Sequence, residues 1–267
     1  MTSFHPIKAN FSVVMVNYKS LELTKACLDL LRDGMQSIGV PVLVVDNYSA
    51  DASVEYLRTL DWVTLIERER SGPEAGSVAH GRALDLALEQ VTTEYVFLLH
   101  TDTFVYDLNV FNMMLSQCAG PQEVAAVGCV EQLNRGRGRS AWRLVSRCLK
   151  HYSRRAFQAL DIKAKAPKPF VEKHLKSFCA LWNVRLIKKH GLQFLMDDRN
   201  PGYKLQDTMV ALGYTIRFIS PRTMFNYLDH LQSGTVAAGG GYAGNHRRVK
   251  VYDQLMKSVQ QVKSIAK

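Results

Sequence analysis

The regular alternation of short apolar runs with longer amphipathic segments most constrains the fold of this chain. Four apolar runs lie in the first hundred residues, at 11–16, 42–45, 63–66 and 95–99. They have the length of strands, and they are apolar except for Ser12 and Thr64, as in strands buried on both faces of a parallel sheet. Segments with helical periodicity follow three of them, at 20–34, 51–60 and 78–88. This order predicts an α/β fold with a doubly wound, mostly parallel sheet and helices on both faces.

The second half of the chain is less regular and predicts a smaller region beside the sheet. Its strand candidates are residues 125–130, 178–182 and 215–219. A glycine-rich stretch at 237–242 then leads to a basic amphipathic helix within 249–267. We therefore expect a single domain over residues 1–248, with halves at about 11–105 and about 106–235, followed by the helix 249–267.

The composition is that of a globular protein. Of the 267 residues, 47% are hydrophobic and 22% are charged, which is an ordinary balance for a folded domain. No apolar stretch approaches the ~20 residues of a membrane-spanning helix, and the first ten residues hold no apolar secretory core. The five cysteines are widely spaced without a CxxC pair, so we expect neither a disulfide framework nor a zinc cluster. These features predict a cytoplasmic protein.

The net charge of +10 is concentrated in one block of basic residues. The block contains Arg135, Arg137, Arg139, Arg143, Arg147, Lys150, Arg154 and Arg155, without an acid between them. Such a block attracts phosphates, nucleic acid or an anionic membrane surface. The alternative is a basic face that is only solvated. We expect the residues around Arg137 to form a loop and residues 141–160 to form a helix.

Polar side chains follow three of the predicted strands. Asn17 and Tyr18 follow the first, Asp46 and Asn47 the second, and His100-Thr101-Asp102 the fourth. The carboxyl ends of parallel strands meet at one edge of the sheet, where open α/β folds bind ligands. Neither a GxGxxG nor a P-loop pattern follows the first strand, which disfavours a dinucleotide-binding or P-loop enzyme. A turn with a helix cap explains Ser49 and Asp51, but leaves Asp46 unexplained.

A series of motifs in this chain resembles family 2 glycosyltransferases of the GT-A fold. The motifs lie at 13–18, 44–51, 80–82, 100–102, 177–182, 203–207, 212–214 and 230–235. His100 replaces the first acid of the Asp-x-Asp metal motif, as in the rhamnosyltransferase-like branch of that family. Gln206 replaces the first acid of a later acidic pair, whereas Asp207 is retained. The resemblance covers roughly residues 11–235 and makes 11–105 the donor half and 106–235 the acceptor half.

The resemblance implies a donor site that holds a divalent metal. Its donor nucleotide-binding residues would be Asn17, Tyr18, Asp46, Asn47, His80, Arg82, His100, Thr101 and Asp102. Asp102 is expected as the first metal ligand and His230 as the second. A carboxylate suits Mg²⁺ or Mn²⁺, and an imidazole ligand favours Mn²⁺. The metal would offset the negative charge that develops on the diphosphate leaving group.

The acceptor side is expected to supply a general base. Inverting transfer needs a base near the acceptor hydroxyl, and the resemblance makes Asp207 the candidate at the start of a helix. Capping of that helix is its alternative role. Trp182, Asp198 and Tyr203 are the expected acceptor pocket, although an aromatic side chain is often part of the core and Asp198 lies in a turn-like sequence.

The sequence therefore predicts an enzyme that moves a hexose from a nucleoside diphosphate sugar to a hydroxyl acceptor, in polysaccharide biosynthesis. The transfer is expected to be inverting and to depend on Mn²⁺ or Mg²⁺. The basic block and the C-terminal helix predict a glycan or lipid-linked, anionic acceptor and peripheral contact with the inner face of the membrane, or a homodimer, rather than a nucleic acid partner. Two alternatives stay open, a sugar nucleotidyltransferase and a non-catalytic nucleotide- or polyanion-binding protein.

Overall fold

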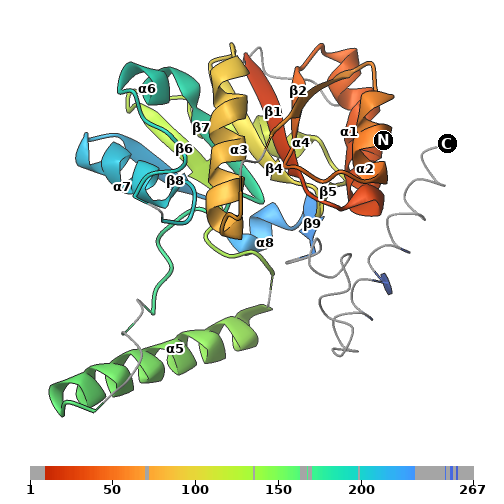
Figure 1. Cartoon of the computed structure of the whole chain (residues 1–267). Helices are drawn as coiled ribbons and strands as arrows, with labels where there is room; N and C mark the ends of the chain where they lie inside the picture. Colours follow the sequence, from red (N-terminus) through yellow and green to blue (C-terminus); the bar gives the residue numbers. More distant parts are fainter. Residues whose placement is uncertain are drawn as a thin grey trace.

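A seven-stranded sheet forms the centre of the protein, in the order β3-β2-β1-β4-β7-β6-β8 (Figure 1). The computed structural model describes residues 10–69, 72–134, 136–162, 167, 170–197, 199–231, 250, 253–254 and 257. The strands are β1 (Phe11–Asn17), β2 (Val42–Asp46), β3 (Val63–Glu67), β4 (Tyr95–His100), β6 (Val124–Gly128), β7 (Cys179–Asn183) and β8 (Thr215–Phe218). Each predicted strand is therefore present.

The sheet is mostly parallel. Strand β1 is parallel to β2 and to β4, and β2 is parallel to β3. On the far side β7 runs antiparallel to both β4 and β6, whereas β6 and β8 are parallel. Asn17 pairs with Asp46, and Val16 pairs with His100. This register brings the polar ends of β1, β2 and β4 to one edge, as predicted.

Helices cover both faces of the sheet, which confirms the predicted doubly wound fold. One face carries α1 (Leu21–Ser37), α2 (Ala52–Arg58), α4 (Asn109–Ser116) and the short α8 (Pro221–Met224). The other carries α3 (Gly76–Gln90), α6 (Val184–Lys189) and α7 (Tyr203–Ala211). Successive residues of β4 point into different cores, because side chains alternate along a strand. Phe97 belongs to the first core and Leu98 to the second.

A two-stranded ribbon lies just beyond the end of β4. It pairs β5 (Thr103–Val105) antiparallel with β9 (Leu228–His230), so that Thr103 lies opposite His230. The amide of Leu231 also donates to the carbonyl of Asp102 at 3.0 Å. The ribbon thus holds a late segment of the chain against the end of a central strand.

Two details of α1 differ from prediction. Gly34 does not end the helix, which continues to Ser37. A Cβ atom at Gly34 would lie 1.9 Å from Leu108 Cδ1, so the glycine gives Leu108 room to pack. Ser20 occupies the N-cap position at the start of the predicted segment, but its side chain does not cap the helix. Its hydroxyl donates to Asn17 Oδ1 at 3.1 Å instead.

The longest described helix, α5 (Gly136–Ala159), extends away from the sheet (Figure 1). It confirms the helix predicted over 141–160 and begins earlier, so the Arg-Gly repeat predicted as a loop lies partly in its first turns. In the described part of the chain, no helix is both long and apolar enough to cross a membrane. The glycine-rich stretch and most of the predicted helix at 249–267 lie outside the described residues.

Candidate active site

A cavity of about 410 Å³ lies at the carboxyl ends of β1, β2 and β4. Its wall consists of Val16, Tyr18, Asn47, Glu74, Gly76, Ala79, His80, His100, Thr101, Asp102, Gln132 and His230. Most of the residues predicted to bind the donor nucleotide are therefore brought together here. Asn17, Asp46 and Arg82 are the exceptions and do not line this cavity.

His100, Asp102 and His230 form a compact group that could hold a divalent metal. Their candidate ligand atoms all lie within 4.8 Å of one another. Asp102 Oδ1 lies 3.3 Å from His230 Nε2 and 3.7 Å from His100 Nδ1. Pairing of β5 with β9 supplies His230, and β4 supplies His100. One carboxylate oxygen and two imidazole nitrogens are suitable ligands for Mn²⁺.

One hydrogen bond orients the His230 ring so that its Nε2 faces Asp102. Its Nδ1 lies 3.0 Å from the carbonyl oxygen of Gln132, and a carbonyl can only accept, so Nδ1 carries the proton. In the neutral ring, Nε2 is then a lone-pair donor directed at Asp102. That buried nitrogen has no hydrogen-bond partner among the described residues. A cation between Nε2 and the Asp102 carboxylate would give this buried nitrogen a partner, so the residues present fit a metal.

Burial keeps the other two histidines of the site neutral. It lowers the pKa of His100 to about 3, and it lowers the pKa of His80 to about 4. Metal binding requires the neutral form of imidazole, so His100 needs no deprotonation near neutral pH. His100 Nε2 lies 2.8 Å from Ser177 Oγ, which leaves Nδ1 on the side of Asp102. Within the described part of the chain, His80 Nε2 is buried without a hydrogen-bond partner.

Asn17 and Asp46 lie beneath the cavity rather than on its wall. Asn17 Nδ2 donates to Asp46 Oδ1 at 2.7 Å and to Ser53 Oγ at 2.8 Å. The other oxygen of Asp46 accepts from the amide of Ser49 at 2.9 Å. This buried network joins the ends of β1 and β2. It therefore sets the positions of the neighbouring residues Tyr18 and Asn47, which do line the cavity.

An arginine and a glutamate fix the outer rim of the same cavity. Arg68 Nη1 donates to Asn47 Oδ1 at 2.7 Å, and Arg68 Nη2 contacts both oxygens of Glu74 at 2.8 Å. Arg82 also contacts Glu74 but does not itself line the cavity. The charge of Arg82 is thus engaged at the rim by an acid that no sequence motif indicated.

A second cavity, of about 580 Å³, lies between α5 and the loops before β7 and α7. Its wall consists of Arg147, Lys150, His151, Arg154, Val171, Glu172, Lys173, His174, Arg199, Asn200 and Tyr203. Five of these side chains are lysine or arginine, and one is an acid. The wall is therefore strongly basic. Tyr203 stacks on His174 with ring centroids 4.2 Å apart.

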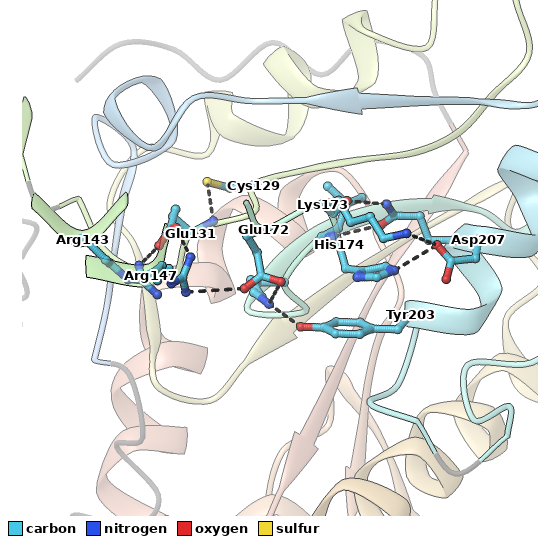
Figure 2. Close-up of polar contacts among 12 residues, drawn as sticks. Cys129, Glu131, Arg143, Arg147, Glu172, Lys173, His174, Tyr203 and Asp207 are labelled. Atoms are coloured by element: carbon cyan, nitrogen blue, oxygen red, sulfur yellow. Dashed lines mark hydrogen bonds and ion pairs between the residues drawn. The ribbon is translucent and has the colours of Figure 1, made fainter. Parts of the chain in front are cut away.

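Asp207 lies beside this second cavity (Figure 2). It occupies the middle of α7 rather than its start, so it does not have the alternative role of a helix cap. Its carboxylate contacts His174 Nε2 at 3.0 Å and Arg199 Nη1 at 2.9 Å. Burial acts to raise the pKa of Asp207, but the hydrogen bonds from Arg199 and His174 outweigh it and hold that pKa below its ordinary value. Asp207 is therefore ionised at neutral pH.

The three residues predicted for the acceptor pocket lie in different surroundings. Tyr203 lines the second cavity. Trp182 is buried in the core, where it packs edge-on against Phe194 with ring centroids 5.7 Å apart. Asp198 lies outside the described residues. The structure thus brings Tyr203 and Asp207 together and keeps Trp182 apart from both cavities.

The sequence did not indicate the roles of several residues in the two sites. Gln132 acts through its backbone carbonyl, which any residue could supply, and the motif at 177–182 did not indicate the contact of Ser177 with His100. Gln206 holds the wall of the second cavity, since its side chain accepts from the amide of Leu175 at 2.9 Å and donates to the carbonyl of Lys173 at 2.7 Å. The sequence indicated this structural role of Gln206 only through the replacement of an acid by an amide in the acidic pair.

The fold and this site define a class, the GT-A type of α/β protein with a candidate metal group at the carboxyl edge of its sheet. The model of glycosyl transferase family 2 matches residues 12–180. This match covers more than half of the chain, so the chain belongs to glycosyl transferase family 2. No curated protein matches the sequence.

Two solved structures illustrate the similarity in fold. The mannosyltransferase PcManGT from Pyrobaculum calidifontis, in complex with GDP-Man and Mn²⁺, superimposes with a TM-score of 0.54 at 20% identity, over 80% of this chain and 55% of that chain. Glucosyl-3-phosphoglycerate synthase from Mycobacterium tuberculosis, in complex with Mn²⁺, UDP and phosphoglyceric acid, superimposes with a TM-score of 0.50 at 17% identity. The match covers 80% of this chain and 69% of that chain. This chain thus spans about half the length of the first of them.

Proposed function

We propose that this protein transfers a hexosyl group from a nucleoside diphosphate sugar to a hydroxyl acceptor, with inversion of the anomeric centre. The observation that carries the proposal is the group of His100, Asp102 and His230 on the wall of the cavity at the carboxyl edge of the sheet. Family membership supports it. The complexes of the two similar structures with GDP-Man and with UDP, both with Mn²⁺, agree with it.

His100, Asp102 and His230 would hold Mn²⁺ or Mg²⁺, which when bound neutralises charge on the diphosphate leaving group. The exposed ring of Tyr18 offers a stacking surface for the base at the mouth of the cavity. Asn47 is fixed by Arg68 and can bond a ribose or base. His80 Nε2, which is buried without a partner, is available to a hydroxyl or phosphate oxygen of the donor.

The acceptor is proposed to enter from the second cavity. His174 lines that cavity, and Ser177 contacts His100 in the first. Three residues span at most about 10 Å, so the two cavities are neighbours along this segment. Asp207 is the proposed general base, because it is ionised at neutral pH and its side chain keeps 35% of its surface exposed.

The basic wall of the second cavity favours an anionic acceptor. Arg147, Lys150 and Arg154 from α5 face Lys173 and Arg199 there. Such an arrangement suits a phosphate or carboxylate on the acceptor. The phosphoglyceric acid in the similar synthase is an acceptor-sized anion of this kind. A glycan or a lipid-linked phosphate has the same chemistry.

The proposed enzyme has further features that rest on the sequence. The replacement of an acid by His100 supports membership of the rhamnosyltransferase-like branch, with a role in polysaccharide biosynthesis at the cytoplasmic face of the membrane. One catalytic domain spans residues 1–248, with a donor half at about 11–105 and an acceptor half at about 106–235. Trp182 shapes the acceptor half from the core, and Asp198 belongs to the same half in the sequence.

A donor screen tests the proposal. The purified protein is incubated with UDP-, GDP- and dTDP-sugars, with and without Mn²⁺, and release of free nucleoside diphosphate is measured. We expect Mn²⁺-dependent release from one class of donor. Tight nucleotide binding without release from any donor would support a non-catalytic binding protein. Release of pyrophosphate from a nucleoside triphosphate and a sugar phosphate would identify a nucleotidyltransferase.

A further inference from the structure

Helix α5 presents an apolar stripe to solvent. Trp142 is 72% exposed, Val145 48%, Leu149 66% and Tyr152 56%. Their spacing of three and four residues places them on one side of the helix. A helix of a globular protein normally turns its apolar side toward the core. In α5 this side is exposed, while the helix extends away from the sheet (Figure 1).

The basic side of α5 faces the protein instead. Arg143 and Arg147 contact Glu131, and Arg147 also contacts Glu172 at 3.7 Å (Figure 2). Arg147, Lys150 and Arg154 line the second cavity. At 100° per residue, these positions lie roughly opposite the stripe. The ion pairs therefore fix the rotation of the helix so that its apolar side points outward.

The charge of α5 discriminates between possible partners. The helix contains seven lysines and arginines and neither aspartate nor glutamate. A second copy of α5 packed on the stripe would bring like charges together, which opposes association. An anionic bilayer attracts each of these side chains. Tryptophan and tyrosine are also the aromatic residues that favour the interface between lipid and water.

We propose that α5 is an interfacial anchor that docks this protein on an anionic lipid bilayer. Trp142, Val145, Leu149 and Tyr152 enter the boundary between headgroups and acyl chains, and the exposed Arg139 and Arg155 contact the headgroups beside the stripe. The helix lies on the membrane and does not span it, since its opposite side is charged. The docking goes beyond sugar transfer and does not depend on it.

Sedimentation with lipid vesicles tests the proposal on the full chain. Wild-type protein is mixed with vesicles of phosphatidylcholine, with and without phosphatidylglycerol, over a range of salt concentrations. We expect binding that requires phosphatidylglycerol and weakens as salt rises. Trp142→Ser combined with Leu149→Ser should weaken binding at least about tenfold, because two apolar side chains are lost from the interface. Arg139→Gln with Arg155→Gln should weaken it less and reduce its salt dependence.

Two further measurements separate docking on lipid from nonspecific adhesion and from self-association. Tryptophan emission should shift to the blue with vesicles, and Trp142→Phe should abolish that shift while retaining binding, because Trp62 and Trp182 pack against the core.

Val210→Ser with Leu212→Ser removes exposed apolar side chains from α7 and the residues after it, and should leave binding unchanged. The proposal is overturned if the wild-type protein does not bind anionic vesicles. It is also overturned if the serine variant of α5 and the serine variant of Val210 and Leu212 weaken vesicle binding equally. If the wild-type protein forms a dimer in solution and does not bind vesicles, and only Trp142→Ser with Leu149→Ser dissociates that dimer, then a second copy of the chain is the partner instead.

Discussion

His230 Nε2 lies 3.3 Å from Asp102 Oδ1, although the two residues come from distant parts of the chain. The pairing of β5 with β9 and the bond from the Leu231 amide to the Asp102 carbonyl make this contact. The candidate metal group therefore exists only when the ribbon has formed. Metal binding is then coupled to the docking of the late segment against β4, because ligands brought together by folding bind as a set.

Asp102→Asn should abolish metal-enhanced nucleotide binding while the fold stays intact. The substitution keeps the shape of the side chain but removes the negative oxygen between two histidines. We expect the rate of sugar transfer to fall by at least ~100-fold. This loss is larger than that expected for removing a residue that only hydrogen-bonds to a metal ligand. His230→Ala should weaken metal dependence less severely. Titration with UDP with and without Mn²⁺ measures this effect, and near-normal turnover of Asp102→Asn would exclude the metal site.

Ser177→Ala should weaken Mn²⁺ binding, although Ser177 is not itself a proposed metal ligand. Its hydroxyl contacts His100 Nε2 at 2.8 Å, and loss of such an orienting bond costs about 10–100-fold in metal affinity. Calorimetric titration of Mn²⁺ in the presence of UDP measures the change. Ser116→Ala is the matched control, because it removes an exposed serine of α4. Unchanged Mn²⁺ affinity in Ser177→Ala would show that His100 is not a ligand.

Asp207→Asn should lower the turnover rate far more than donor affinity. The amide keeps the size of the side chain but cannot take a proton from the acceptor hydroxyl. General-base contributions of about 10²–10⁴-fold set the expected loss in kcat. Steady-state kinetics with the identified donor and acceptor measure it, and nucleotide affinity is the control. If the variant raises only the KM for acceptor, then Asp207 positions His174 and Arg199 and the base lies elsewhere.

The same carboxylate should make stability depend on pH. The pKa of Asp207 in the folded state lies below its ordinary value of 3.8, so its contribution is present above that value and is lost as the pH falls through the folded pKa. The Tm of Asp207→Asn should therefore lie ~2 °C below that of wild type at neutral pH. This difference should close as the pH falls below 3.8 and through the folded-state pKa. Asp33→Asn, at an exposed site in α1, should follow wild type throughout.

Neutralising the basic wall of the second cavity should weaken acceptor binding. Arg147→Gln combined with Lys150→Gln removes two charges that α5 directs into the cavity. We expect the KM for an anionic acceptor to rise about tenfold or more and its salt dependence to flatten, with donor hydrolysis unchanged. Arg139→Gln, on the same helix but outside the cavity wall, is the control. Equal KM values for wild type and variant across a salt series would show that these basic residues are only solvated and do not bind the acceptor.

The secondary structure of this protein could be predicted well from periodicity. The apolar runs at β1, β2 and β4 are buried on both sides, so local sequence was sufficient, whereas β3 at the edge of the sheet leaves Thr64 exposed. Residues at the ends of these strands were also predictable as neighbours, because parallel strands share one carboxyl edge. Their separate roles were not, since Asn17 and Asp46 turned out to lie beneath the cavity and Tyr18 and Asn47 on its wall.

Sequence alone thus determined the doubly wound sheet, the edge at which the candidate site lies, and the position of Asp102 at the end of β4. The motif at 230–235 also predicted His230 as a second ligand, but only the tertiary structure decided that the Gln132 carbonyl orients His230 and that Ser177 contacts His100. It also decided that Trp182 is core and that α5 turns its apolar side outward. Periodicity reports which residues share a face of a helix, but what that face contacts depends on ion pairs made with residues far along the chain.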